Sequence, residues 1–209
     1  MSPNDDEPIW YVAYGSNCRR ERFEAYLTGG RADGATRQEN GARDPRPPAR
    51  SEPFWFPHGV RFVGNSAKWG GGGVAFLDHE PGGRAPGRRY LITRGQFDDV
   101  AAQESRRAAT PMPVDQLVAG SVTALGDGFY DGLLAFPPID GIPVVTFTSP
   151  RPPTSRPPNP PSAPYLGTIL RGLLEVHDEP VESLVAALMA APGIAAGWTT
   201  AEVVALASK

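Results

Sequence analysis

The first thirty residues of the chain change from one hydrophobic pattern to another. Residues 9–14 form a continuous apolar and aromatic run bounded by proline and glycine, which predicts a buried strand. The apolar positions then change to helical spacing at Phe23, Tyr26 and Leu27, and two glycines follow as a stop. The pattern therefore predicts a strand that turns through residues 15–17 directly into a short helix.

The rest of the chain combines short strand patterns with helical ones. We expect strands at 60–63, 74–77, 88–92, 128–136 and 142–148, and helices at 93–107, 165–174, 181–189 and from 199 onward. Two of these helices begin with capping patterns, Thr-x-x-Gln and Thr-x-x-Glu. Residues 31–57 have no periodicity and are expected to form a long loop. Short strands separated by turn residues and interrupted by helices predict an α+β protein with a barrel or a curved sheet.

Glycine and proline, 24 of each among 209 residues, bear on the domain organisation. Eight of the sixteen residues in 149–164 are proline, which excludes helix and central strand. We interpret this segment as an extended surface linker rather than a ligand for an aromatic groove. The length predicts a single domain, residues 1–209, with a core at about 9–175 and a C-terminal helical extension at 176–209.

Charge and cysteine content narrow the classes of partner and cofactor. The net charge of −3 gives no reason to expect a nucleic-acid or membrane partner. The acidic N-terminus lacks the apolar core of a signal peptide, and no run approaches the roughly 18 apolar residues of a membrane span. One cysteine and three histidines are a poor inventory for zinc, so we expect no metal, no internal disulfide and a cytoplasmic location. Of the 20 cationic residues 18 are arginine, which we attribute to coding bias.

The turn Tyr14-Gly15-Ser16-Asn17 is the first candidate for chemistry. A turn between a strand and a helix can aim successive backbone N–H groups and the positive end of the helix dipole at one point. This arrangement suits a carboxylate or a developing oxyanion, and Gly15 permits a close approach of substrate to the backbone. The alternative is an ordinary strand-to-helix turn in which Asn17 caps the helix.

Glu104 is the second candidate, because a helix through residues 93–107 places it on the stripe that buries Phe97, Val100 and Ala101. A desolvated carboxylate favours its neutral form and becomes a useful general base near neutral pH. The alternatives are neutralisation by one of the many arginines or a place at the edge of the stripe. The other polar positions of this helix are expected on a solvated face: Asp98, Asp99 and Ser105.

Three further positions each allow a functional and a structural interpretation. Trp69 precedes four glycines, where the backbone can pass close to a ligand, although a flexible turn explains the run equally well. Tyr165 enters a helix between prolines and can present its hydroxyl to a cavity, or it can be an ordinary buried tyrosine. Cys18 leaves open a thiol-dependent hydrolase.

Taken together, these segments resemble the gamma-glutamylcyclotransferase-like superfamily. Its members have a strand ending in Tyr-Gly-Ser-Asn, then Trp-Gly-Gly, then Gln-Glu on a helix, then Pro-Ser-x-x-Tyr with a glycine seven residues later. The matching residues occur here in the same order: Tyr14, Gly15, Ser16 and Asn17, then Trp69, Gly70 and Gly71, then Gln103 and Glu104, then Pro161, Ser162, Tyr165 and Gly172. The chain departs from the pattern at residues 18–20, where relatives more often carry an apolar residue, and in its longer loops.

The resemblance implies a small mixed β-barrel with surrounding helices and a pocket between the Tyr14–Asn17 turn and Glu104. In such enzymes the carboxylate takes a proton from the α-ammonium group of a γ-glutamyl substrate, and the freed amine attacks the γ-carbonyl. The products are 5-oxoproline and an amine or amino acid, and the reaction needs no cofactor. Gly15, Ser16, Asn17 and Tyr165 would bind the glutamyl moiety, alongside Tyr14 and the Trp69-Gly70-Gly71 element.

Several alternatives stay open at the level of sequence. The same barrel can serve as a non-catalytic module that binds an amino-acid-like ligand and recruits a partner through the proline-rich loop. The leaving group can derive from glutathione, a γ-glutamyl amino acid, a polyamine conjugate or a protected natural product. The protein is expected to be a monomer or a dimer.

Overall fold

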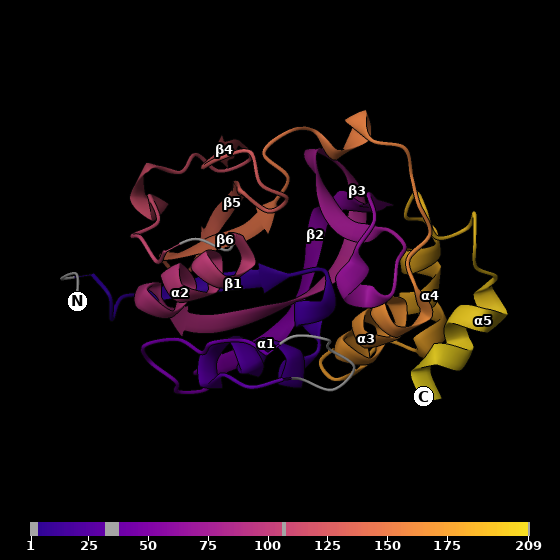
Figure 1. The fold of residues 1–209 in the computed structure, drawn as a ribbon, viewed down its shortest axis with the longest axis horizontal. Helices are drawn as coiled ribbons and strands as arrows, with labels where there is room; N and C mark the ends of the chain where they lie inside the picture. Colours follow the sequence, from indigo (N-terminus) through magenta and orange to yellow (C-terminus); the bar gives the residue numbers. More distant parts are fainter. Residues whose placement is uncertain (1–3, 32–37, 106–107, 209) are drawn as a thin grey trace.

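In the part of the chain that the structure describes, six strands form one mixed sheet in the order β2-β3-β1-β6-β5-β4 (Figure 1). The structure is a computed structural model and describes residues 4–31, 38–105 and 108–208. The strands are β1 (Pro8–Ala13), β2 (Arg50–Val63), β3 (Val74–Thr93), β4 (Val122–Ala124), β5 (Gly132–Ile139) and β6 (Ile142–Thr148). β1 is parallel to β6, and the other neighbours are antiparallel. In the described residues the edge strands β2 and β4 do not pair, so this α+β sheet is open rather than closed.

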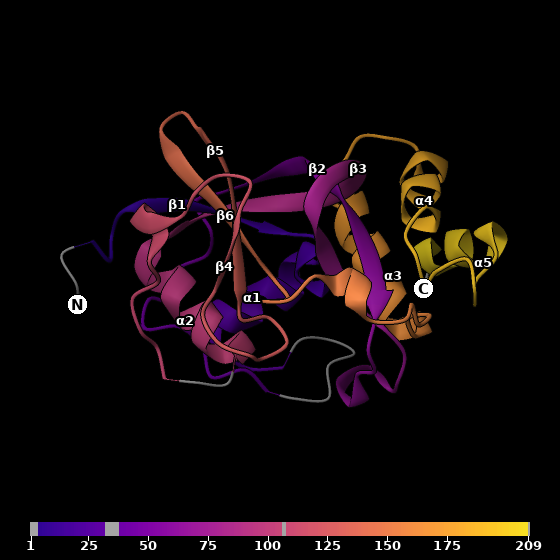
Figure 2. The same ribbon diagram turned by 90° about the horizontal axis from the view of Figure 1, so that it is seen from above.

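The described segments contain five α-helices, which lie around the sheet: α1 (Arg20–Thr28), α2 (Arg94–Ser105), α3 (Ala163–Leu174), α4 (Val181–Met189) and α5 (Thr200–Ala205). Figure 2 shows α1 and α2 on one face of the sheet, whereas α4 and α5 gather beyond the end formed by β2 and β3. Among the described residues, no helix combines the length and the apolar character needed to cross a membrane.

The long strands β2 and β3 differ most from the expectations. The segments expected as separate strands at 74–77 and 88–92 are the two ends of β3, which pairs with β2 along most of its length. β2 begins at Arg50, so the expected loop at 31–57 is wrong for residues 50–57. Proline at positions 53 and 57 hides this strand in the sequence, but an edge strand tolerates proline because one side needs no ladder hydrogen bonds.

Both capping patterns are confirmed. The Thr93 backbone N–H donates to Gln96 Oε1 at 3.1 Å, and the Gln96 N–H donates to Thr93 Oγ1 at 3.2 Å. Thr199 and Glu202 form the same reciprocal pair at the start of α5. The expected end of the second helix at residue 107 lies outside the described residues, and α2 is described as far as Ser105.

The expected solvated face of α2 is wrong for two of its three residues. Asp98 and Asp99 are buried, with 6% and 7% of their surface exposed. The Arg43 backbone N–H and guanidinium donate to the Asp99 carboxylate at 2.9 and 3.0 Å, and the Met112 N–H donates to Asp98 at 2.9 Å. The spacing of polar residues in α2 could not predict this burial, because the segments that cover this face of the helix come from distant parts of the chain.

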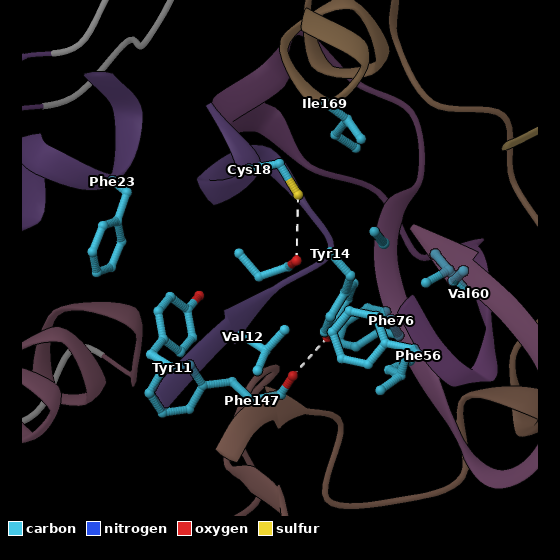
Figure 3. Packing of buried hydrophobic residues seen from close by; sticks show 14 of the residues in the cluster. Tyr11, Val12, Tyr14, Cys18, Phe23, Phe56, Val60, Phe76, Phe147 and Ile169 are labelled. Atoms are coloured by element: carbon cyan, nitrogen blue, oxygen red, sulfur yellow. Dashed lines mark hydrogen bonds between the residues drawn. The ribbon is translucent and has the colours of Figure 1, made fainter. Parts of the chain in front are cut away.

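Aromatic side chains fill the core between the sheet and the helices (Figure 3). Phe97 of α2 stacks on Phe147 of β6 with ring centroids 4.9 Å apart, and Phe23 of α1 stacks on Tyr90 of β3 at 4.1 Å. Offset and stacked aromatic pairs contribute roughly 0.5–1.5 kcal/mol beyond their area. These contacts hold α1 and α2 against the strands that carry the candidate site.

The glycine run and the proline-rich segment meet in space. Gly72 forms an isolated bridge with Pro161, and the Gly73 N–H donates to the Pro160 carbonyl at 2.9 Å. A Cβ at Gly73 would lie 2.1 Å from the Asn159 carbonyl oxygen, so no other residue fits there without movement of the backbone. Part of the segment at 149–164, expected as a linker, is thus fastened to the sheet.

Candidate active site

One cavity of about 510 Å³ collects most of the residues singled out from the sequence. Its lining includes Tyr14, Gly15, Ser16, Asn17, Trp69, Glu104 and Tyr165. Gly70 and Gly71 do not line it, because they turn back and donate their N–H groups to Ala67 and Ser66. Lining residues that sequence reasoning missed include Tyr11, Arg22, Tyr26, Glu39, Lys68 and Phe129.

The Tyr14–Asn17 turn is held from beneath by β3. The Tyr90 hydroxyl donates to the Asn17 carbonyl at 2.8 Å, and the Arg88 guanidinium donates to the Cys18 carbonyl at 3.1 Å. Both side chains are buried, Tyr90 completely and Arg88 to 4% exposure. These hydrogen bonds to the carbonyls of Asn17 and Cys18 fix the orientation of the backbone at the end of the turn.

Asn17 connects the turn to Glu104. Asn17 lies within the single-turn 3₁₀ helix η1 (Ser16–Cys18), and Arg19 rather than Asn17 occupies the cap position of α1. The Asn17 Nδ2 donates to Glu104 Oε1 at 3.1 Å and to the Tyr11 hydroxyl at 3.0 Å. Glu104 is half-buried, and no arginine or lysine among the described residues forms an ion pair with it. The carboxylate is therefore oriented by a neutral amide inside the cavity.

For the reaction that the resemblance implies, replacing Asn17 with Ala should lower kcat by about 10- to 100-fold, because a hydrogen bond to a charged group contributes roughly 1.5–3 kcal/mol and orients the carboxylate. The measurement is kcat and KM for release of the 5-oxoproline that this reaction would produce. Tyr11→Phe is the matched control, since it removes the other partner of the amide and leaves the Asn17–Glu104 bond in place. Equal losses in the two variants would contradict this role for Asn17.

Tyr165 lies directly over the turn. Its hydroxyl accepts the Ala75 N–H at 3.2 Å, and a Cβ on Gly15 would lie 3.1 Å from its oxygen. The ring packs on Trp69 with centroids 5.0 Å apart, and burial raises the pKa of the Tyr165 phenol. Tyr165 is thus a neutral hydroxyl at the cavity, whereas the Tyr14 hydroxyl donates to the Phe147 carbonyl at 2.7 Å (Figure 3).

Cys18 points away from this chemistry. The thiol is fully buried and lies 3.3 Å from the Ala13 carbonyl, as Figure 3 shows. Burial raises the pKa of the Cys18 thiol to about 12, and nucleophilic cysteine chemistry needs the thiolate. The geometry does not favour the thiol-dependent hydrolase.

A Cys18→Ala variant is expected to keep the rate of the reaction that the resemblance implies within about twofold, since that reaction does not require the thiolate. The lost packing should lower the free energy of unfolding by about 1 kcal/mol. The assay is product release together with urea denaturation. A folded Cys18→Ala protein without activity would restore the thiol-dependent interpretation.

A charged cluster forms another part of the cavity wall. Arg22 Nη2 donates to Glu39 Oε1 at 2.8 Å, and Lys68 Nζ donates to the same oxygen at 3.1 Å. Arg22 also donates to the Tyr26 hydroxyl at 2.9 Å and is only 2% exposed. Burial acts to raise the pKa of Glu39, but Arg22 and Lys68 lower it overall, so Glu39 is ionised.

One of these residues had a signal in the sequence. Arg22 lies four residues before Tyr26, on the edge of the apolar stripe of α1, as Glu104 does on α2. A charged residue beside an apolar stripe was the reason to single out Glu104, and the same reason holds for Arg22. Lys68 and Glu39 do not lie in a segment with helical or strand periodicity, so no local pattern indicated that they line a cavity. Among the described residues, no group of three or more histidine, cysteine or acidic side chains is arranged to hold a metal ion.

Comparison with solved structures defines the class of fold. An uncharacterized human protein aligns with a TM-score of 0.53 and 18% identity over 98% of this chain and 100% of its own. A gamma-glutamyl cyclotransferase aligns with a TM-score of 0.51 and 17% identity over 97% of this chain and 99% of its own. The chain has the gamma-glutamylcyclotransferase-like fold that the motifs indicated, but in its described residues the sheet is open and is not the closed barrel that the resemblance implied.

Sequence comparison adds one curated relative. Histone deacetylase 5 of Arabidopsis thaliana is 31% identical over 185 residues, which is 80% of this chain and 28% of that protein. The chain thus spans little more than a quarter of the relative's length, and the relative's name describes the whole protein. No protein-family model matches the chain.

Proposed function

We propose that this protein is a cyclotransferase that releases 5-oxoproline and an amine or amino acid from a γ-glutamyl substrate. The observation that carries the proposal is the Glu104 carboxylate, held by Asn17 of the Tyr14–Asn17 turn within a cavity that Tyr165 also lines. The fold is that of a gamma-glutamyl cyclotransferase.

Glu104 acts as the general base. It takes a proton from the substrate's α-ammonium group, and the free amine attacks the γ-carbonyl carbon to close a five-membered ring. Oriented intramolecular attack reaches effective molarities of roughly 10⁵–10⁸ M, so the protein need not provide a nucleophile. The Glu104 carboxylate lies within the cavity, and no arginine or lysine in the described part of the chain forms an ion pair with it, which suits this proton transfer.

The turn and Tyr165 bind the glutamyl moiety. The backbone N–H groups of residues 15–17 hold the α-carboxylate or the oxyanion that forms on the γ-carbonyl, and the Tyr165 hydroxyl adds a further donor. Tyr90 and Arg88 keep the turn in position, because they donate hydrogen bonds to the carbonyls of Asn17 and of Cys18, which follows it. Trp69 packs on Tyr165 and closes this part of the wall.

The test is mass spectrometry of 5-oxoproline after incubation with a panel of γ-glutamyl amino acids, amines and peptides. We expect release from at least one member at a rate above the spontaneous cyclisation of the same compound. Binding of γ-glutamyl compounds without any release, measured by calorimetry on the same panel, would instead support the non-catalytic binding module.

A further inference from the structure

The proposed reaction needs a second proton transfer that Glu104 does not supply at the same moment. When the bond between the γ-carbon and the leaving nitrogen breaks, that nitrogen must gain a proton, because an alkylamide anion is too basic to depart. A separate acid near Glu104 would serve this step. The inference below rests on the proposed function.

Lys68 is the candidate for such an acid, because it lines the same cavity as Glu104 and carries a proton that it can donate. It belongs to the single-turn 3₁₀ helix η2 (Ala67–Trp69) and lines the same cavity as Glu104. Its side chain is 24% exposed, and its Nζ lies 3.1 Å from Glu39 Oε1 and 5.9 Å from the centre of the Tyr26 ring. Its neighbour Trp69 packs on Tyr165, so Lys68 lies beside the part of the wall that holds the glutamyl moiety.

The surroundings of Lys68, burial above all, favour release of its proton. Burial lowers the pKa of the Lys68 ammonium, and the Arg22 guanidinium lowers it further, against the opposing effects of Glu104 and Glu39. Glu39 is shared, because Arg22 and Lys68 both donate to its Oε1. Arginine does not give up its proton in proteins, so Lys68 is the one of this pair that can act as an acid.

The cationic residues of the chain support a specific requirement for lysine here. Arginine provides 18 of the 20, and the two lysines are Lys68 and Lys209. In a chain with this bias, a lysine on the cavity wall stands out. Arginine can also form an ion pair with a carboxylate such as Glu39, but it cannot donate a proton as an acid.

We propose that Lys68 is the catalytic acid that protonates the departing amine. Glu104 first accepts a proton from the α-ammonium group, and the amine nitrogen forms its bond to the γ-carbon. Lys68 Nζ then gives a proton to the leaving nitrogen as its bond to the same carbon breaks and the carbonyl reforms. The surplus proton on the ring nitrogen returns to the Lys68 amine through solvent, and the proton on Glu104 leaves with the released amine as its ammonium.

The test compares two leaving groups of similar size in Lys68→Met and Lys68→Arg. γ-Glutamyl-benzylamide must be protonated to release its amine, whereas γ-glutamyl-p-nitroanilide releases a stabilised nitrogen that depends far less on an acid. We expect both variants to lose about 100-fold or more in kcat with the benzylamide and no more than about fivefold with the p-nitroanilide. Lys68→Arg keeps the positive charge, so it separates proton donation from simple electrostatic binding. Circular dichroism checks that both variants fold.

Three results would overturn the assignment. Equal losses with the two substrates would make Lys68 a structural or binding residue, and full activity of Lys68→Arg with the benzylamide would reduce its role to charge. Unchanged activity of Lys68→Met with both substrates would exclude any role. If the wild-type protein releases 5-oxoproline from no γ-glutamyl compound, the proposed function itself fails, which is distinct from an active enzyme that is indifferent to Lys68.

Discussion

Replacing Glu104 with Gln is expected to lower the rate of 5-oxoproline release by at least about 100-fold, the range that general-base catalysis typically contributes. The amide has nearly the same shape, and its oxygen can still accept the Asn17 Nδ2 hydrogen bond made by Glu104 Oε1 at 3.1 Å. It cannot accept the proton from the α-ammonium group at neutral pH. Folding should therefore be preserved while catalysis is lost.

The experiment measures product release and thermal unfolding in parallel. Glu182→Gln is the matched control, because Glu182 is an exposed carboxylate at the start of α4, and the same chemical change there should leave the rate unaltered. Full activity of folded Glu104→Gln would contradict the proposed function. A loss of activity that accompanies unfolding would point to a structural role for the carboxylate instead.

The second large effect is expected at Gly172 in α3. A Cβ at this position would lie 2.2 Å from the Arg19 nitrogen and 2.3 Å from the Cys18 carbonyl carbon, which are backbone atoms of the turn that carries Asn17. Backbone cannot rotate away as a side chain can. Gly172→Ala should cost about 3 kcal/mol of unfolding free energy, at the upper end of the usual cost of overpacking, and should displace the turn so that activity falls as well.

Gly167 on the same helix is the matched control. A Cβ there would lie 3.0 Å from Arg171 Nη1, the end of a flexible side chain. Alanine in a helix interior is favoured over glycine by roughly 0.5–1 kcal/mol, so Gly167→Ala should be neutral or stabilising. Urea denaturation and 5-oxoproline release give both quantities, and equal stability of the two variants would show that α3 and the turn are not tightly packed.

Local patterns predicted those elements whose environment follows from the sequence near them. β6 and α4 have the expected bounds at 142–148 and 181–189, because a bounded apolar run and a 3.6-residue stripe each define an element without help from elsewhere. The prediction was wrong for residues 50–57 of β2, because the prolines in this segment are typical of a loop. The segment is a strand because it pairs with β3. The prediction that Asp98 and Asp99 are exposed was wrong for a similar reason. Arg43 and Met112, which are distant in sequence, form hydrogen bonds with these carboxylates.

The candidate site was predicted in part. Tyr14, Asn17, Glu104 and Tyr165 each had a local reason to be singled out, and the structure places all of them in the lining of one cavity. Gly70 and Gly71 were expected at the site because a glycine run lets the backbone approach a ligand and because they match the Trp-Gly-Gly motif, but they do not line the cavity. Within the charged cluster only Arg22 had a local signal, at the edge of the apolar stripe of α1, whereas Glu39 and Lys68 come from segments that meet it only in the folded protein.

The contact between the glycine run and the proline-rich segment has a consequence for how this wall of the cavity can change. Trp69 receives a hydrogen bond from Ser162 at 2.7 Å, so the wall is attached to residues about ninety positions later in the chain. Proline restricts its own backbone conformation, and glycine has no side chain, so the backbones of the proline-rich segment and the glycine run can come into contact. Insertions at residues 150–156 would leave this attachment intact, whereas an insertion at 158–162 would detach Trp69 and Lys68 together. The two segments can therefore be exchanged between related proteins only as a matched pair.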